Sequence, residues 1–213
     1  MHAVREDFYE RARELGIYLR HVQQVSEKAK SATELATAKS LRAAGYLLTY
    51  NLIEATARNA VTSVFDHLRN RVVTFDALRG QLKSILLAHA LRRNPDELAE
   101  ELQSIATDLV AKAFNSKCLF SGNVDARKLR EMAKKIGYGA NRTTRSAAPS
   151  LRIVKDHRND LAHGNKTFAE VGRDATIEDL RRHAAHAIVY MREMIRNVEA
   201  YLTEQQYLAS NAS

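Results

Sequence analysis

Apolar residues recur at helical spacing from the beginning of the chain. Between Arg5 and about Ala32, apolar side chains follow one another every three or four residues, which places them on one face of an amphipathic helix. They are Phe8, Ala12, Leu15, Leu19, Val22 and Val25. A second run, from about Glu34 to Arg69, contains the segment LLTYNLIEATARNAVTSVF, which is apolar on more than one face. We therefore predict an amphipathic helix followed by a longer helix at the centre of the core.

Two further helices are predicted before residue 115. After Thr74, the segment FDALRGQLKSILLAHAL carries an apolar stripe, and we expect this helix to end before Asn94. The stripe consists of Leu78, Leu82, Ile85 and Leu86. The segment NPDELAEEL then begins a fourth helix, with Asn94 as N-cap, Pro95 at the first helical position and Glu97 at the third.

The chain from residue 115 to 148 is the least regular, because Gly122, Gly137 and Gly139 interrupt its pattern. It predicts a connector that contains one short basic helix, from about Val124 to Ile136.

Two helices are predicted in the C-terminal third. Pro149 is suited to the first position of a helix that ends at His163, where Gly164 can adopt the left-handed conformation after the helix. Thr176 and Asp179 then form the N-cap pattern of a last helix that continues to about Tyr207. At 1.5 Å per residue, its roughly 30 residues span about 45 Å.

Composition favours an all-α fold in a single domain, residues 1–213. Only two prolines and eight glycines are present, too few for the turns of many short strands. With 45% hydrophobic residues, a chain of 213 residues can bury one sizeable core.

The sequence also indicates in which cellular compartment the protein is expected. The N-terminus is charged, and no window approaches the roughly 18 consecutive apolar residues of a membrane span. The single cysteine, Cys118, excludes an internal disulfide and a cysteine-rich zinc site. We therefore expect a cytoplasmic protein without a membrane partner.

The positive charge is concentrated in one segment. Residues 127–158 contain ten basic and two acidic side chains, which account for the whole net charge of +8. The segment is suited to binding phosphates, although a solvated basic face is an equally simple interpretation. Its candidate phosphate ligands are Arg142, Arg145, Arg152 and Lys155.

The segment HRNDLAHGNK, residues 157–166, places an arginine five residues before a histidine. The same spacing occurs in Arg152/His157 and Arg181/His186, so spacing alone selects nothing. Only the pair Arg158/His163 is followed by a helix-ending glycine and has a polar amide, Asn159, directly after the arginine.

These residue types suit the cleavage of RNA by its own 2′-hydroxyl. That reaction needs a base for the hydroxyl proton, a cation at the crowded phosphorus and an acid for the leaving 5′-oxygen. His163 fits the first role because histidine titrates near neutral pH, and Arg158 fits the second because its planar guanidinium can bind two phosphate oxygens. Asn159 would orient the phosphate.

Helical geometry separates the two side chains. Five residues along a helix leave Arg158 and His163 about 140° apart around the axis and roughly 7.5 Å apart along it. Either Arg158 reaches around the end of the helix, or a second copy in a symmetric dimer completes the site.

The segment RNDLAHG resembles the Arg-x4-His signature of the HEPN superfamily of ribonucleases, in which the residue after the arginine is typically polar. Three further segments resemble the MAE-type branch of HEPN nucleases: LLTYNLIEATARNAV, SGNVDARKLREMAKKIGY and GNKTFAEVGRDATIEDL. This resemblance implies a helical bundle with long core helices and a short motif helix before the C-terminal helix.

The resemblance also implies a homodimer in which two Arg/His pairs share a cleft and cut RNA without a metal or cofactor. Catalysis would use Arg158, His163 and Asn159. Relatives of this kind serve as toxins with a neutralising antitoxin protein, or in defence against phage. Some carry a tyrosine two residues after the histidine as a target for nucleotidylation, and Asn165 stands there in this chain.

Other residues leave alternatives open. Arg158 could pair with Asp156 or Asp160 on the surface, and His163 could cap the helix. Glu54 is either a buried structural carboxylate or a support for the site, and His157 is a bystander candidate. His183 and His186 could bind a metal but lack an evident third ligand. Tyr138 and Phe168 could stack on bases, although core packing is the simpler expectation.

Two rival functions remain at this point. One is a HEPN module without catalysis, an adaptor that binds RNA, a nucleotide or a partner protein through the same cleft. The other is a helical DNA-binding regulator that uses residues 127–158, although the segment contains no recognisable helix-turn-helix pattern.

Overall fold

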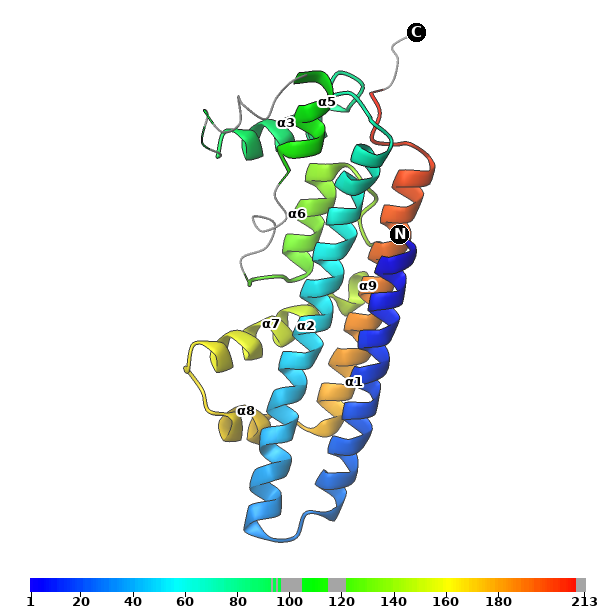
Figure 1. Ribbon diagram of the computed structural model, residues 1–213. Helices are drawn as coiled ribbons and strands as arrows, with labels where there is room; N and C mark the ends of the chain where they lie inside the picture. Colours follow the sequence, from blue (N-terminus) through cyan, green and yellow to red (C-terminus); the bar gives the residue numbers. More distant parts are fainter. Residues whose placement is uncertain (93, 95, 97–104, 115–121, 210–213) are drawn as a thin grey trace.

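Three long helices form the axis of the molecule (Figure 1). The computed structural model describes residues 1–92, 94, 96, 105–114 and 122–209. In it, α1 (His2–Lys28), α2 (Ala32–Asn70) and α9 (Ile177–Thr203) lie side by side. The shorter elements are α3 (Gly80–Ala90), α5 (Ile105–Lys112), α6 (Ala126–Ile136), the 3₁₀ helix η2 (Arg145–Ala147), α7 (Ala148–Ala162) and α8 (Phe168–Asp174). The described residues contain no strand longer than a single bridge, and the all-α prediction is confirmed.

The shorter helices lie at two levels along α2. In Figure 1, α3, α5 and α6 surround its upper half, whereas α7 and α8 pack against its lower half. The residues at which α2 meets these helices are mostly aromatic or small. Tyr46 and Tyr50, one turn apart and both fully buried, face the motif helix α7.

Local capping explains several helix boundaries. Ser31 and Glu34 form a complete capping box at the start of α2, and Thr176 and Asp179 form the predicted one at the start of α9. Asp125 caps α6 by accepting a hydrogen bond from the backbone N–H of Lys128. Gly164 follows α7 with a φ of +69°, as predicted for the residue after the motif helix.

The third helix begins later than predicted, at Gly80 rather than after Thr74. Residues 77–79 instead pair with the C-terminal segment: the N–H of Arg79 donates to the carbonyl of Tyr207 over 2.9 Å, and Leu78 and Leu208 form an antiparallel bridge. Because this pairing also uses the C-terminal segment, α9 ends at Thr203, before the predicted Tyr207. The predicted fourth helix, NPDELAEEL, lies almost entirely outside the described residues.

Helix α8 was not predicted, although its capping box is present in the sequence as Thr167 and Glu170. It crosses α2 at very short range, because a Cβ atom on Gly172 would stand 1.8 Å from the carbonyl oxygen of Lys39. Only glycine permits this contact. The crossing fixes the chain that follows the motif.

None of the helices in the described ranges joins the length and the apolar composition that crossing a lipid bilayer requires.

Candidate functional site

The motif helix α7 presents its two key residues on different sides. Leu151 and Val154 are buried against the bundle, and Arg158 follows them on the same face, so that its side chain points inward and is half-buried. His163 is the C-cap residue and its side chain is exposed. The helix is regular up to Ala162, so the angular separation of about 140° predicted from the sequence applies.

The inward face holds Arg158 through three contacts. Its guanidinium carbon lies 4.7 Å from the centre of the Tyr50 ring, a cation–π contact. Its Nη1 donates hydrogen bonds to the carbonyl of Gly122 and to the side-chain oxygen of Asn159, each over 3.0 Å. These contacts hold the guanidinium in one position before any ligand arrives.

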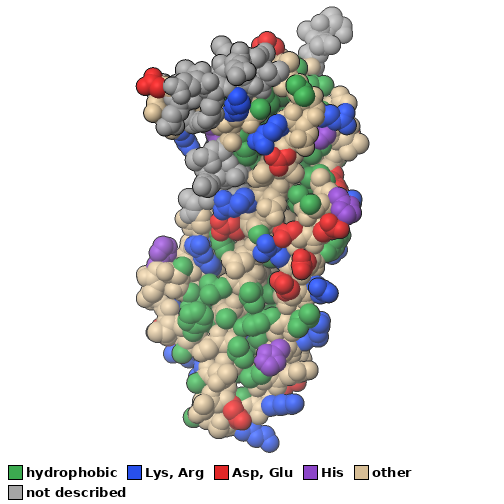
Figure 2. Space-filling view, viewed as in Figure 1, with side chains coloured by type: hydrophobic (Ala, Val, Ile, Leu, Met, Phe, Trp, Pro, Cys, Tyr) green, Lys and Arg blue, Asp and Glu red, His purple; other side chains and the backbone are tan. Residues whose placement is uncertain are grey.

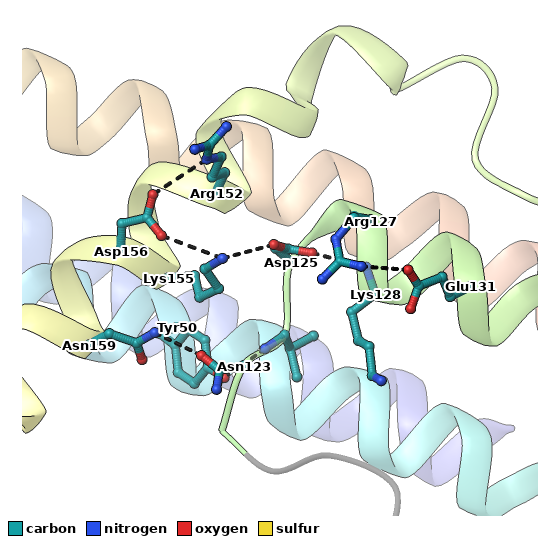
Figure 3. A network of polar contacts seen from close by, with 11 residues as sticks. Tyr50, Asn123, Asp125, Arg127, Lys128, Glu131, Arg152, Lys155, Asp156 and Asn159 are labelled. Carbon is teal, nitrogen blue, oxygen red and sulfur yellow. Dashed lines mark hydrogen bonds and ion pairs between the residues drawn. The ribbon is translucent and has the colours of Figure 1, made fainter.

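A short strap, which we define as residues 122–124, covers this arginine. Gly122 contacts Arg158, and the Oδ1 of Asn123 accepts a hydrogen bond from Asn159 over 2.7 Å (Figure 3). The N–H of Val124 donates to the Tyr50 hydroxyl over 3.0 Å. Gly122 has a φ of +78°, which favours glycine, and an added Cβ would lie 3.2 Å from the guanidinium of Arg158. Three consecutive residues thus meet the motif or its support.

The surface ion pairs considered for Arg158 are not formed in the described part of the chain. Asp156 instead approaches Arg152 at 3.5 Å and Lys155 at 3.4 Å, and Asp160 pairs with Lys166 at 3.1 Å. The hypothesis that Arg158 serves only to pair with a neighbouring carboxylate is therefore wrong.

Lys155 lies between two carboxylates (Figure 3). Its ammonium group contacts Asp125 at 2.9 Å and Asp156 at 3.4 Å, and the hydrogen bond with Asp125 raises the pKa of Lys155. Burial acts to raise the pKa of Asp125, but hydrogen bonds from the Lys128 backbone and from Lys155 lower it below its ordinary value. Lys155 thus joins α7 to the start of α6, and much of its charge is already compensated.

Arg142 and Arg145 are exposed on the segment before α7, which α9 anchors through Glu193. The buried carboxylate of Glu193 accepts hydrogen bonds from the N–H groups of Arg142, Thr143 and Thr144, and from the Thr144 hydroxyl, over 2.6 to 3.1 Å. The exposed arginines therefore project from a fixed backbone.

The same hydrogen bonds determine the ionisation of Glu193. Burial acts to raise its pKa, but the bonds from Thr144 and from the backbone of Arg142 and Thr143 outweigh burial and lower the pKa to about 2. The carboxylate is therefore charged at neutral pH.

Three histidines lie on the core side of α7: His157 of α7 itself, and His183 and His186 of α9. His183 and His186 each place Nδ1 within hydrogen-bond distance of the Ser150 hydroxyl, at 2.9 and 2.7 Å. His157 packs on the Tyr46 ring, with 4.4 Å between ring centres, and burial lowers the pKa of His157. No group of three or more histidine, cysteine, aspartate or glutamate residues is placed to bind a metal within the described ranges.

The remaining candidate site residues lie either in the core or nearer the surface. Tyr138 is buried and packs edge-on to Tyr201, so the expectation of core packing is confirmed. Phe168 is 41% exposed at the start of α8. Glu54 is half-buried one turn after Tyr50 and pairs with Arg58 at 2.8 Å. It thus lies next to the residue that supports Arg158.

One exposed face of α7 connects several predicted site residues. Arg152, Asn159 and His163 are seven and four residues apart, a spacing that aligns them along one side of the helix. Figure 2 shows, in addition, hydrophobic side chains gathered over the middle of α2 and the adjoining parts of α7 and α8. Leu48 and Phe168 are exposed apolar residues on α2 and α8.

The structure thus joins Arg158 and Asn159 to the strap, and it pairs Lys155 with Asp125, the residue directly after the strap. His163 stands apart at the end of the helix. Sequence analysis missed three contributors to this region: Tyr50, Asn123 and Glu193. Tyr50 belongs to an apolar run that predicted only core packing, and Glu193 lies on α9, far along the chain from the loop that it holds.

No curated protein and no solved structure matches the chain. The family described as HEPN_MAE_28990-like HEPN matches residues 2–207, nearly the whole sequence. This chain therefore belongs to the MAE_28990-like HEPN family.

Proposed function

We propose that this protein is an endoribonuclease of the HEPN type, which cleaves RNA without a metal ion. The observation that supports this most is the placement of the motif. His163 is exposed at the end of α7, in line with Asn159 and Arg152, and Arg158 is held half-buried just before it.

In the proposed reaction, the 2′-oxygen of a ribose attacks the adjacent phosphorus while His163 takes the hydroxyl proton. The bond from phosphorus to the 5′-oxygen breaks, and that oxygen takes a proton from an acid. The products are a 2′,3′-cyclic phosphate and a 5′-hydroxyl end. Asn159 would orient the phosphate.

Arg158 would stabilise the negative charge that develops on the phosphate oxygens. Among the described residues, both of its hydrogen bonds leave from Nη1. A guanidinium carries five N–H donors, so other donors of the same planar group can bind a phosphate without breaking the contact with Gly122.

We further propose that a homodimer forms the working site. Arg158 and His163 face different directions on one helix, and a second copy related by a two-fold axis can bring the missing group to each. The apolar residues on α2 and α8, among them Leu48 and Phe168, support an interface beside the motif helix.

The exposed arginines near the motif are the candidate RNA-binding residues. Arg142, Arg145 and Arg152 are exposed and would guide the RNA strand, whereas Lys155 contributes less because Asp125 and Asp156 compensate its charge.

We propose that the enzyme acts in the cytoplasm as a toxin, controlled by an antitoxin protein, or in defence against phage.

A second candidate function is a HEPN adaptor that binds RNA, a nucleotide or a partner protein without cutting it. The observation that favours it is the engagement of Arg158 by Tyr50, Gly122 and Asn159, away from the exposed His163. In an adaptor, these contacts would be structural.

One assay distinguishes the two. Purified protein is incubated with labelled RNA in excess EDTA, beside the variants Arg158→Ala and His163→Ala and a 2′-deoxy substrate. The nuclease predicts cleavage by wild type alone, with each variant reduced by roughly a hundredfold or more, the range of general base and charge stabilisation. Binding without cleavage would establish the adaptor, and cleavage of the 2′-deoxy substrate would exclude the proposed chemistry.

A further inference from the structure

A groove of about 540 Å³ lies between the first turns of α6 and α7, beside the strap. Four cationic side chains line it: Arg127 and Arg130 from α6, and Arg152 and Lys155 from α7. The carboxylates Asp125 and Asp156 also line it. The basic segment 127–158 includes the α6 cations, but the phosphate ligands named individually from the sequence lie only on α7 and on the preceding loop. The part of the groove that Arg127 and Arg130 form is therefore new.

The two carboxylates are engaged within the groove. Asp125 accepts hydrogen bonds from the Lys128 backbone and from Lys155, each over 2.9 Å, and so compensates Lys155 (Figure 3). Asp156 lies 3.5 Å from Arg152 and is itself half-exposed, with 53% of its side chain accessible. The groove thus retains an excess of positive charge.

Arg127 and Arg152 are both available to a ligand. Their side chains are 72% and 77% exposed, and each pairs with a carboxylate one turn later, Glu131 for Arg127 and Asp156 for Arg152. Exposed pairs of this type contribute little to stability, so a phosphate can replace the carboxylates at small cost.

Helix α7 adds a further attraction for anions. Ala148 and Pro149, its first residues, line the groove, and no described side chain caps this helix. The Ala148 N–H already donates to the carbonyl of Arg145 and Pro149 has no N–H, so the helix contributes only the positive end of its dipole near the arginines.

From these observations we infer that the groove binds a backbone phosphate of single-stranded RNA, flanking the phosphate that is cleaved. The choice of RNA as the ligand rests on the proposed function. The face of α7 that carries Arg152 at the groove continues through Asn159 to His163. Eleven residues of helix separate Arg152 from His163, roughly 16 Å, which a strand of a few nucleotides can span.

The test measures RNA binding separately from cleavage. Fluorescence anisotropy of a labelled single-stranded RNA is recorded at several salt concentrations, with all proteins carrying His163→Ala so that the RNA stays intact. The groove variant is Arg127→Gln with Arg152→Gln. The matched control is Arg13→Gln with Arg20→Gln, two exposed arginines that share a face of α1.

We expect the groove variant to bind RNA roughly tenfold more weakly, with a slope of log affinity against log salt that is smaller by about one. The control should change affinity less than twofold. Asp156→Asn, which removes a competing carboxylate, should strengthen binding, whereas Glu14→Gln on α1 should not. Equal effects of the groove and control variants would overturn the inference, because they would indicate only general charge attraction.

Competition identifies the source of the phosphate. Adenosine monophosphate should displace RNA only at concentrations far above that of the RNA, and equal potency would show that the groove takes free nucleotides instead. Failure of the nuclease is distinguishable: wild type would then not cleave, while the groove variant would still bind RNA more weakly. Cleavage by wild type with an unchanged salt slope in the groove variant would reject the groove alone.

Discussion

Tyr50 is the residue on which the environment of Arg158 depends. Its ring lies under the guanidinium at 4.7 Å, and its hydroxyl accepts the backbone N–H of Val124 in the strap. Burial raises the pKa of Tyr50 to about 12, so the hydroxyl stays protonated over the physiological range. One side chain therefore supports both the arginine and the segment that covers it.

We predict that Tyr50→Leu lowers kcat for RNA cleavage by roughly tenfold relative to Tyr50→Phe. Leucine removes the aromatic face, and a cation–π contact contributes about 0.5–2 kcal/mol, which converts to such a factor when it positions a catalytic group. Phenylalanine keeps the ring and loses only the hydroxyl, with its hydrogen bonds to Val124 and Glu54. Kinetics of both variants, with their unfolding temperatures, provide the comparison.

Phe65→Leu is the control, since Phe65 is equally buried on α2 but stacks on Phe114 away from the motif. It should destabilise the protein without the loss of kcat. If Tyr50→Leu and Tyr50→Phe cleave RNA equally fast, the ring does not position Arg158.

At the scale of helices and loops, several boundaries that were predicted correctly are set by local capping, although the capping box of α8 was overlooked. The starts of α6 and α9 and the end of α7 follow from Asp125, from Thr176 with Asp179, and from Gly164, all of which act within a few residues. The predicted start of α3 was wrong because residues 77–79 pair with a segment near the C-terminus, and no local pattern reveals this pairing.

The residues of the candidate site also fall into two groups, those that are recognisable from local sequence and those that are not. Arg158, Asn159 and His163 are recognisable as a motif because they are adjacent in the sequence. Tyr50 and Glu193 are not, because they reach their partners only after the helices have packed. Lys155 counted as an available cation, but its partner Asp125 is 30 residues away in the chain.

The loop that carries Arg142 and Arg145 depends on Glu193, so we predict that Glu193→Gln destabilises the protein by about 1–3 kcal/mol at pH 7. Because the folded pKa of about 2 lies below the ordinary value of 4.5, the charge of Glu193 stabilises the fold above about pH 4.5. This contribution is lost as the pH falls toward 2. Urea unfolding at pH 7 and pH 3 should show a smaller difference between variant and wild type at pH 3.

RNA binding by Glu193→Gln should also weaken, since the backbone beneath the two arginines loses a charged acceptor. Glu178→Gln, an exposed carboxylate on the same helix, should alter stability and RNA binding far less. A variant whose stability deficit is the same at both pH values would contradict the proposed role of the charge.

At the scale of the whole molecule, the concentrated positive charge and the exposed apolar surface can serve different functions. The excess positive charge belongs to the segment 127–158, which forms α6, the loop before α7 and most of α7. The apolar surface of Figure 2 lies over α2, α7 and α8. RNA binding and self-association can therefore use different parts of the surface around the same motif helix.

We predict that Leu48→Lys shifts the protein from dimer to monomer and lowers cleavage in parallel, because a lysine ammonium is costly to bury in an apolar interface. Leu91→Lys is the control, since Leu91 is 86% exposed at the end of α3, away from α7. Analytical ultracentrifugation measures the assembly, and the activity per chain should follow the dimer fraction.

Mixing the inactive variants Arg158→Ala and His163→Ala extends this test. If each site takes its arginine and its histidine from different copies, a mixed dimer contains one complete site and regains activity. Lack of recovery, with mixed dimers shown to form, would place both groups of each site in the same chain.

Gly172 has a consequence for His163, the proposed catalytic base. Because the backbones of α8 and α2 touch there, the chain after the motif is held against α2 nine residues beyond His163. The turn from residue 163 to 167 is then a short span between two fixed supports, α7 and α8. The imidazole of His163 can rotate about its side-chain bonds but cannot move far. In the proposed reaction, RNA and the second copy would therefore have to approach the histidine.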